Sequence, residues 1–350
     1  MGAIRLRALH PSFRTHQMQH RRNDYDVTNT VQVSSPDAVR RAVRELYATT
    51  WPYFDFSRLD SAFADFARLF KGDYPGYLGC DTVYHDTQHS LDGTLAAARL
   101  CVGHDRSHRT EQQIGPERAM LCVVCALFHD SGYIRTTTDD TVRNGAEMTR
   151  NHVSRSAQFL AGYLRNINYA EWIPIATQIV HFTGYEMRFD QIHLDSPLDR
   201  TTGHLLGTAD LIAQMSDRCY LEKCRDRLYP EFILGGIAVA KDATTGQPKV
   251  MYSSGLDVLR QTPRFVDSIH RSHLDGEFGG LYRCVEVLFN GQNPYMNAIE
   301  RNMEYLQEVL QSERWPMLRR DPPCFASEKN PVQNIRSLAL DRLKNLWAKP

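Results

Sequence analysis

The segment 116–130, PERAMLCVVCALFHD, constrains the fold more than any other part of the chain. Residues 119–128 are apolar without interruption, which is typical of a helix that is buried on every side. The segment therefore predicts a central helix of the core. The apolar run ends in His129 and Asp130, two polar side chains that are costly to bury unless something satisfies them.

The rest of the chain is dominated by the helical period, with apolar residues recurring at i, i+3 or i+4, and i+7. Residues 235–253 depart from it, because Thr-Gly between β-branched runs favours a short hairpin or an extended loop. We therefore predict an all-α fold, a helical bundle with this one insertion. The helical segments ahead of the insertion are 35–51, 55–72, 87–104, 116–128, 146–166, 172–185 and 202–232, and those after it are 262–272, 280–289, 294–311 and 334–347.

A length of 350 residues favours one large domain with appendages. We expect residues 1–30 to form a flexible basic arm and residues 31–312 to form the helical core. Residues 313–350 are predicted to be a linker followed by a last helix. Within the core, segment 202–232 is expected to be one long helix that ends at Pro230.

The composition argues against several classes of partner. The 41 basic and 41 acidic residues balance, which gives no electrostatic attraction towards nucleic acid or an anionic membrane. No window approaches 18 apolar residues, and the first residues lack the apolar region of a signal peptide. The eight cysteines have no framework spacing, and Cys122 and Cys125 fall inside the apolar run, so buried thiols and a cytoplasmic location are expected.

Polar residues that interrupt apolar helices suggest a metal centre. Besides His129 and Asp130, the segments on either side each offer one imidazole or carboxylate, namely His89, His152, His181 and Asp210. Helical bundles build metal sites from inward side chains on facing helices. Four histidines and two aspartates suffice for two divalent cations that share a carboxylate, and such mixed ligands accept Mn, Fe, Co, Ni, Zn or Mg.

The order His89, His129-Asp130, His152, His181, Asp210 resembles the H…HD…H…H…D pattern of the HD-domain superfamily, all-α metal-dependent phosphohydrolases. The resemblance covers about residues 80–220, where the metal site is expected. It implies that Asp130 bridges two metals. His89, His129 and Asp210 would complete one metal, and His152 and His181 would bind the other.

The segment 84–89, YHDTQH, resembles the signature of class I cyclic-nucleotide phosphodiesterases. That resemblance implies that His89 binds metal while His85, one helical turn earlier, is the general acid. Together with Asp130, His85 is thus a candidate catalytic residue. The expected activity is hydrolysis of a phosphodiester of a nucleotide or cyclic nucleotide by metal-bound hydroxide. Two positions depart from the pattern, because Asp86 and Tyr133 stand where those enzymes have asparagine and histidine.

Weaker candidates surround these motifs. Arg135 and Arg155 are expected near the phosphate, and Asp217 is expected two turns after Asp210 on the same helical face. Asp86 and Tyr133 are further candidates for contact with the substrate or the ligands. The expected partner is a small-molecule phosphoester, with a homodimer left open. Two alternatives are a mixed-valent di-iron HD-domain oxygenase and a non-catalytic module that senses a nucleotide.

Overall fold

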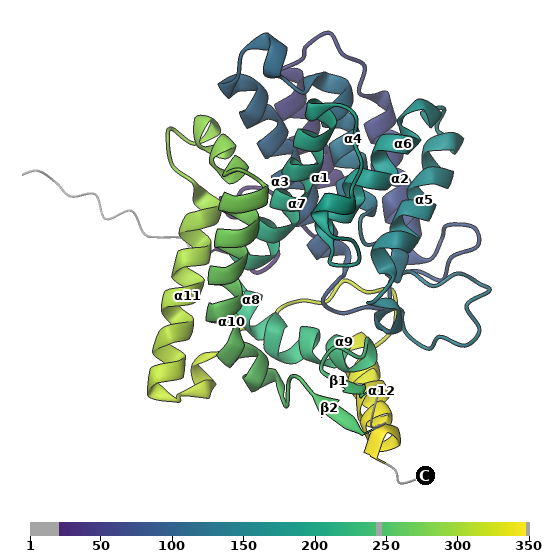
Figure 1. The fold of residues 1–350 in the computed structure, drawn as a ribbon, viewed down its shortest axis with the longest axis vertical. Helices are drawn as coiled ribbons and strands as arrows, with labels where there is room; N and C mark the ends of the chain where they lie inside the picture. Colours follow the sequence, from purple (N-terminus) through teal and green to yellow (C-terminus); the bar gives the residue numbers. More distant parts are fainter. Residues whose placement is uncertain (1–20, 243–246, 348–350) are drawn as a thin grey trace, which may run out of the picture.

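A computed structural model describes residues 21–242 and 247–347 of the chain. Within this part the fold is mostly helical, and a single two-stranded sheet accompanies the helices (Figure 1). The prediction of an all-α fold with a short hairpin is therefore confirmed. The hairpin pairs β1 (Val239–Lys241) with β2 (Pro248–Val250) in antiparallel register. None of the described helices has the length and hydropathy needed to cross a membrane.

Three helices form the centre of the molecule: α3 (Thr87–Ser107), α4 (Gly115–Phe128) and α7 (Pro197–Ser216). Every residue from 119 to 128 in α4 is buried, as the apolar run predicts. The cysteines of this run, Cys122 and Cys125, are free buried thiols. The polar groups at the end of α4 consequently lie deep inside the bundle.

The remaining helices cover this centre. On one side lie α1 (Pro36–Ala48) and α2 (Ser57–Lys71), and α2 ends at Gly72 in the left-handed conformation that favours glycine. Next to α4 and α7 lie α5 (His152–Asn166) and α6 (Ile173–Ile179). The other flank of α7 is formed by α10 (Gly255–Ile269) and α11 (Pro294–Ser312), which stand side by side in Figure 1. Residues 281–288 form a 3-10 helix against α3.

The predicted long helix 202–232 is wrong, because α7 ends at Ser216. The chain turns at Asp217, whose side chain accepts the backbone N–H of Cys219 and the ammonium of Lys223. It then continues as α8 (Tyr220–Lys223), a π-helical turn (Cys224–Leu228) and α9 (Tyr229–Leu234). Pro230 does not end this last helix but stands in its first turn, where a missing N–H costs nothing.

Both ends of the described chain are docked on the bundle. Residues 21–30 do not form the flexible arm expected from sequence, because Asp26 is fully buried and pairs with Arg99 at 2.7 Å. The part of that arm before residue 21 lies outside the described residues. At the other end, the predicted last helix is α12 (Pro331–Trp347), which packs against α9 beside the hairpin (Figure 1).

Candidate metal centre

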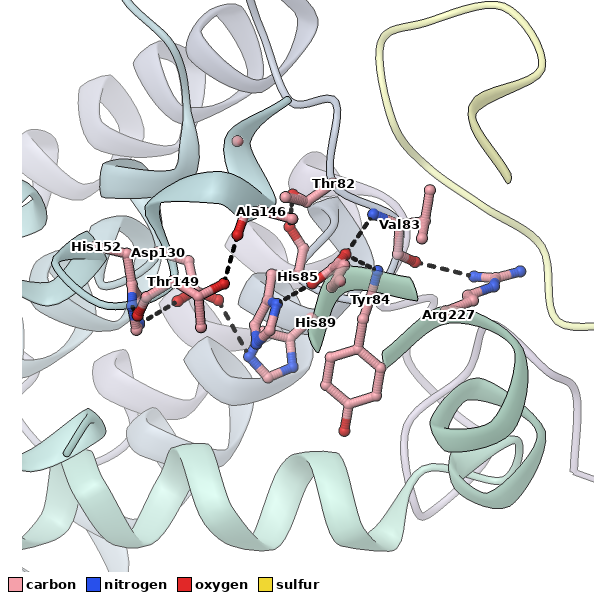
Figure 2. Close-up of polar contacts among 12 residues, drawn as sticks. Thr82, Val83, Tyr84, His85, His89, Asp130, Ala146, Thr149, His152 and Arg227 are labelled. Atoms are coloured by element: carbon pink, nitrogen blue, oxygen red, sulfur yellow. Dashed lines mark hydrogen bonds and ion pairs between the residues drawn. The ribbon is translucent and has the colours of Figure 1, made fainter. Parts of the chain in front are cut away.

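The three central helices bring four candidate ligands to one point. His89 lies in the first turn of α3, His129 and Asp130 follow the last turn of α4, and Asp210 lies in the middle of α7. The Nε2 atom of His89 is 3.2 Å from Oδ2 of Asp130 and 3.3 Å from Oδ1 of Asp210. For Nε2 of His129 the same two distances are 3.2 and 3.5 Å. Figure 2 shows His89 and Asp130 facing each other across the cluster.

The chemistry of these atoms fits a divalent cation. Nε2 of His129, Oδ2 of Asp130 and Oδ1 of Asp210 are buried, and none has a hydrogen-bond partner among the described residues. Ligand atoms about 2.1 Å from one shared cation lie roughly 3.0–3.4 Å from each other. The observed spacings match this range. Apart from the His–Asp contacts given above, these three converging atoms have no partner among the described residues, and a cation would satisfy them.

Backbone carbonyls fix how two of the imidazoles are protonated. Nδ1 of His129 lies 2.8 Å from the Ala126 oxygen, and Nδ1 of His152 lies 2.8 Å from the Thr149 oxygen. A carbonyl can only accept, so in each ring Nδ1 carries a proton, and in the neutral ring Nε2 presents its lone pair. Metal-binding histidines use the same arrangement, because the second hydrogen bond sets the tautomer and the ring orientation.

The ligand charges stabilise one another. Burial lowers the pKa of His89, yet its contacts with Asp130 and Asp210 outweigh burial and raise that pKa to about 9. Burial likewise acts to raise the pKa of Asp210, but His129 and His89 bring it down to about 2. A cation that binds here therefore competes with protons on the imidazoles.

The other two predicted ligands lie farther from the aspartates. Nε2 of His152 is 3.8 Å from Oδ1 of Asp130, on the opposite side of that carboxylate from His89. His181 is 7% exposed, and its Nδ1 has no hydrogen-bond partner among the described residues. Neither aspartate forms an ion pair with His181 in the described part of the chain. The structure thus brings His152 to the shared carboxylate and leaves His181 outside direct contact.

A close approach of two segments places His152 there. Gly132 lies in the 3-10 turn after Asp130, and a Cβ at Gly132 would stand 1.8 Å from the carbonyl oxygen of His152. Only glycine permits this contact. The backbone N–H of Gly132 also donates to the hydroxyl of Ser156, which fixes the turn against α5.

His85 points into the same region but is held by a different partner. Its Nδ1 is 2.5 Å from Oε2 of Glu231, and Oε1 of Glu231 accepts the backbone N–H groups of Val83 and Tyr84. Because Glu231 is buried and anchored at three points, it fixes the imidazole orientation. This arrangement leaves Nε2 of His85 free to act on a substrate.

Tyr133 completes the wall beside His85. Its ring stacks on His85 with centroids 4.5 Å apart and on His152 with centroids 4.3 Å apart. Among the weaker predictions, Tyr133 alone lines the cavity described below.

The other weaker candidates have structural partners away from the cluster. Asp86 caps α3 by accepting the N–H groups of Gln88 and His89. Arg135 pairs with Asp81, and Arg155 pairs with Asp139. Asp217 binds Lys223 instead of a ligand histidine, because the helix that was to carry it ends one residue earlier. In the described part of the chain, the side chains of these four residues form no hydrogen bond or ion pair with the side chains of the candidate ligands.

Sequence reasoning missed Glu231. It lies 146 positions from His85, and no local pattern links the two. One signal was present, since Glu231 is a single acid followed by the apolar residues 232–234. An acid in such a place needs a buried partner.

A cavity of about 500 Å³ opens over the cluster. Its floor includes His85, His89, Asp130, His152 and Asp210. The walls come from residues 182–186, the π-helical turn, α9 and α10. The candidate ligands and His85 therefore share one space that can admit a small molecule.

Searches of protein-family models, of curated proteins and of solved structures find no match to this chain. The HD-domain resemblance therefore stands on the motif residues alone. The geometry of His89, His129 and Asp130 adds a group of side chains that could hold a metal ion.

Proposed function

We propose that this protein is a metal-dependent phosphodiesterase that acts on a small molecule. The observation that carries the proposal is the His85–Glu231 pair, which stands beside the candidate ligands and faces the same cavity. A cation site alone serves many reactions. An oriented imidazole next to it supports one in which a leaving group needs a proton.

His89, His129, Asp130 and Asp210 would hold one divalent cation, and His152 with Oδ1 of Asp130 would contribute to a second. A divalent cation in such a site supplies Lewis-acid chemistry, because it polarises a phosphoryl group and lowers the pKa of water. The donor set of nitrogen and carboxylate oxygen suits Mn, Fe, Co, Ni, Zn or Mg.

The chain's own contribution is the proton at His85. In hydrolysis of a phosphodiester, water adds to phosphorus and the bond from phosphorus to the leaving oxygen breaks. Nε2 of His85 gives its proton to that oxygen, while Glu231 at Nδ1 keeps the orientation of the ring. The products are a phosphomonoester and an alcohol.

A nucleotide or cyclic nucleotide as substrate follows from the phosphodiesterase resemblance. The His85–Glu231 pair favours hydrolysis over the oxygenase and over a non-catalytic module, since neither of those requires an oriented acid. The residues that form the walls of the cavity are a separate guide to the kind of substrate.

The test compares leaving groups in the wild type and in His85→Ala. General acid catalysis contributes about 10²–10⁴-fold, so the variant should lose about that factor with alkyl leaving groups. With p-nitrophenol, which leaves without a proton, the loss should be roughly tenfold or less. In Glu231→Gln, the side-chain oxygen can still accept the backbone N–H groups. This variant should also lose more activity with alkyl leaving groups than with p-nitrophenol, but by a smaller factor than His85→Ala.

Metal content is the control for this comparison. Both variants should bind as much manganese as the wild type, because neither residue belongs to the ligand cluster. Equal losses with both leaving groups, or loss of metal from His85→Ala, would contradict the acid role.

A further inference from the structure

The cavity above the candidate metal centre has a mostly apolar wall. Beyond the ligands, its sides are built from aliphatic and aromatic residues of five segments, which include Leu211, Leu228, Phe232, Ile237, Val258 and Phe265. The surface near its mouth stays apolar, since Tyr185 is 71% and Phe265 is 40% exposed. Such a contiguous apolar surface is uncommon without a ligand or partner.

The cavity offers little that could bind additional negative charge. Among its described lining residues, Arg150 is the sole arginine or lysine. The guanidinium of Arg150 donates to the carbonyl oxygens of Gly235 at 3.3 Å and Gly236 at 2.6 Å. A polyphosphate needs several free cationic groups beyond the metal centre, so this wall does not suit it.

Several polar side chains of the wall are used within the protein. Tyr84 donates to Gln214, Gln261 donates to the Met251 oxygen, and Glu186 accepts from the first N–H groups of α5. The hydroxyls of three threonines bond to backbone carbonyls, namely Thr149, Thr183 and Thr262. A ligand rich in hydroxyl and amide groups would lose its bonds to water here without equal replacements.

We propose that the substrate of this site is a phosphodiester with one negative charge whose second substituent is a large hydrocarbon group. This inference rests on the proposed function. The phosphate would lie over His89, Asp130 and Asp210, and the hydrocarbon group would fill the space between α9 and α10. Hydrolysis adds water to phosphorus and releases one substituent as an alcohol, while the other stays on the phosphomonoester.

The first experiment uses p-nitrophenyl diesters, which share one leaving group and differ in the second substituent: methyl, hexyl and the 5′-oxygen of thymidine. Each buried methylene strengthens binding about three- to fourfold. The hexyl diester should therefore exceed the methyl diester in kcat/KM by roughly 100-fold or more. Preference for the thymidine diester over the hexyl diester would overturn the inference and would support a nucleotide as the substrate.

Two substitutions at the mouth sharpen the test. Phe265→Ser should lower the ratio of hexyl to methyl turnover by roughly tenfold, whereas Phe265→Leu should keep it. Val287→Ser is the matched control, because Val287 is 49% exposed and does not line the cavity. An unchanged ratio in Phe265→Ser would contradict the placement of the hydrocarbon group.

A binding measurement separates this inference from the proposed function. Calorimetry on the manganese-loaded protein compares dihexyl phosphate with 3′,5′-cyclic adenosine monophosphate. Dihexyl phosphate binding without hydrolysis of any diester would support the cavity assignment and sink the phosphodiesterase proposal. Hydrolysis that is independent of chain length, together with no binding of dihexyl phosphate, would support the phosphodiesterase proposal and contradict the assignment of the cavity.

Discussion

The two sides of the Asp130 carboxylate are built differently. Towards Oδ2, the ligands sit on helices α3, α4 and α7, which are packed together along their lengths, and the contacts lie at 3.2–3.5 Å. Towards Oδ1, the one residue in contact is His152, the first residue of α5. There the one contact is 3.8 Å long.

The difference divides the candidate metal centre into a fixed part and an adjustable part. Buried helices of the central layer hold the first ligand set, so a cation there would meet its ligands already in place. Helix ends and turns hold the second set, and these elements have fewer constraints. We therefore expect the first cation to bind tightly and the second to bind more weakly.

The largest effect is expected from Asp130→Asn, because this side chain belongs to both sides. The substitution removes the shared charge that faces three histidines, so metal binding on both sides and diester hydrolysis should fall by at least about 10³-fold. Metal analysis and turnover with bis(p-nitrophenyl) phosphate would measure this loss.

Asp199→Asn is the matched control for that substitution. Asp199 is also a buried carboxylate with a cationic partner, Arg118, at 2.6 Å, but it lies away from the cavity. Full metal retention in Asp130→Asn would contradict the claim that the two sides of the site share Asp130 as a ligand.

A smaller effect should separate the two sides. His129→Ala should weaken the tighter cation by at least about 100-fold, because removing a ligand costs more than removing one of its supporting partners. His152→Ala should leave the tighter cation unchanged and remove the weaker one. Calorimetric titration with manganese measures the affinity of both sites, and loss of the tighter site in His152→Ala would reverse our ranking.

Gly132→Ala tests the segment that positions the adjustable side. The added Cβ meets the His152 carbonyl, so the substitution should destabilise the protein by about 1–3 kcal/mol and weaken the second cation only. Gly162→Ala in the same α5 helix is the control, because its Cβ meets nothing and alanine favours a helix. Thermal unfolding distinguishes them, and equal stability of the two variants would refute the close approach.

A pH dependence is also expected on the fixed side. In metal-free protein the pKa of His89 is raised to about 9, so at neutral pH a cation must displace a proton from this ring. Apparent affinity should rise with pH and level off near pH 9, by roughly tenfold per pH unit for one proton. Metal titrations between pH 6 and 9 would show this slope, and an affinity that falls with pH would contradict the role of His89.

The same linkage has a consequence for stability. A raised histidine pKa stabilises the metal-free fold below pH about 6.5, the ordinary value, and this contribution is lost as pH rises through about 9. The lowered pKa of Asp210, about 2, has the opposite sign and is lost only in strong acid.

The helix-borne part of this site could be predicted from sequence for a physical reason. The apolar run of α4 can only be a central buried helix, and a polar pair at its end requires partners from neighbouring helices. His89 and Asp210 follow from the same reasoning. The positions of residues at helix ends were harder to predict from the sequence. A helix break such as the one at Asp217 depends on a capping hydrogen bond that forms only after folding.

Pairings between distant segments were the hardest to predict. Glu231 of α9 meets His85 and the backbone just before α3, and the local signal of a lone acid beside apolar residues does not identify its partner. Asp86 is the reverse case. An aspartate directly before Thr87 at the start of a helical pattern is a recognised cap, and this local signal would have predicted its role better than resemblance did.

Anomalous X-ray diffraction from crystals soaked in manganese tests the central claim most directly. We predict a strong peak bounded by His89, His129, Asp130 and Asp210, with a weaker one between Asp130 and His152. The absence of any peak at the four ligands, in protein whose fold matches the one described, would show that this cluster is not a metal centre.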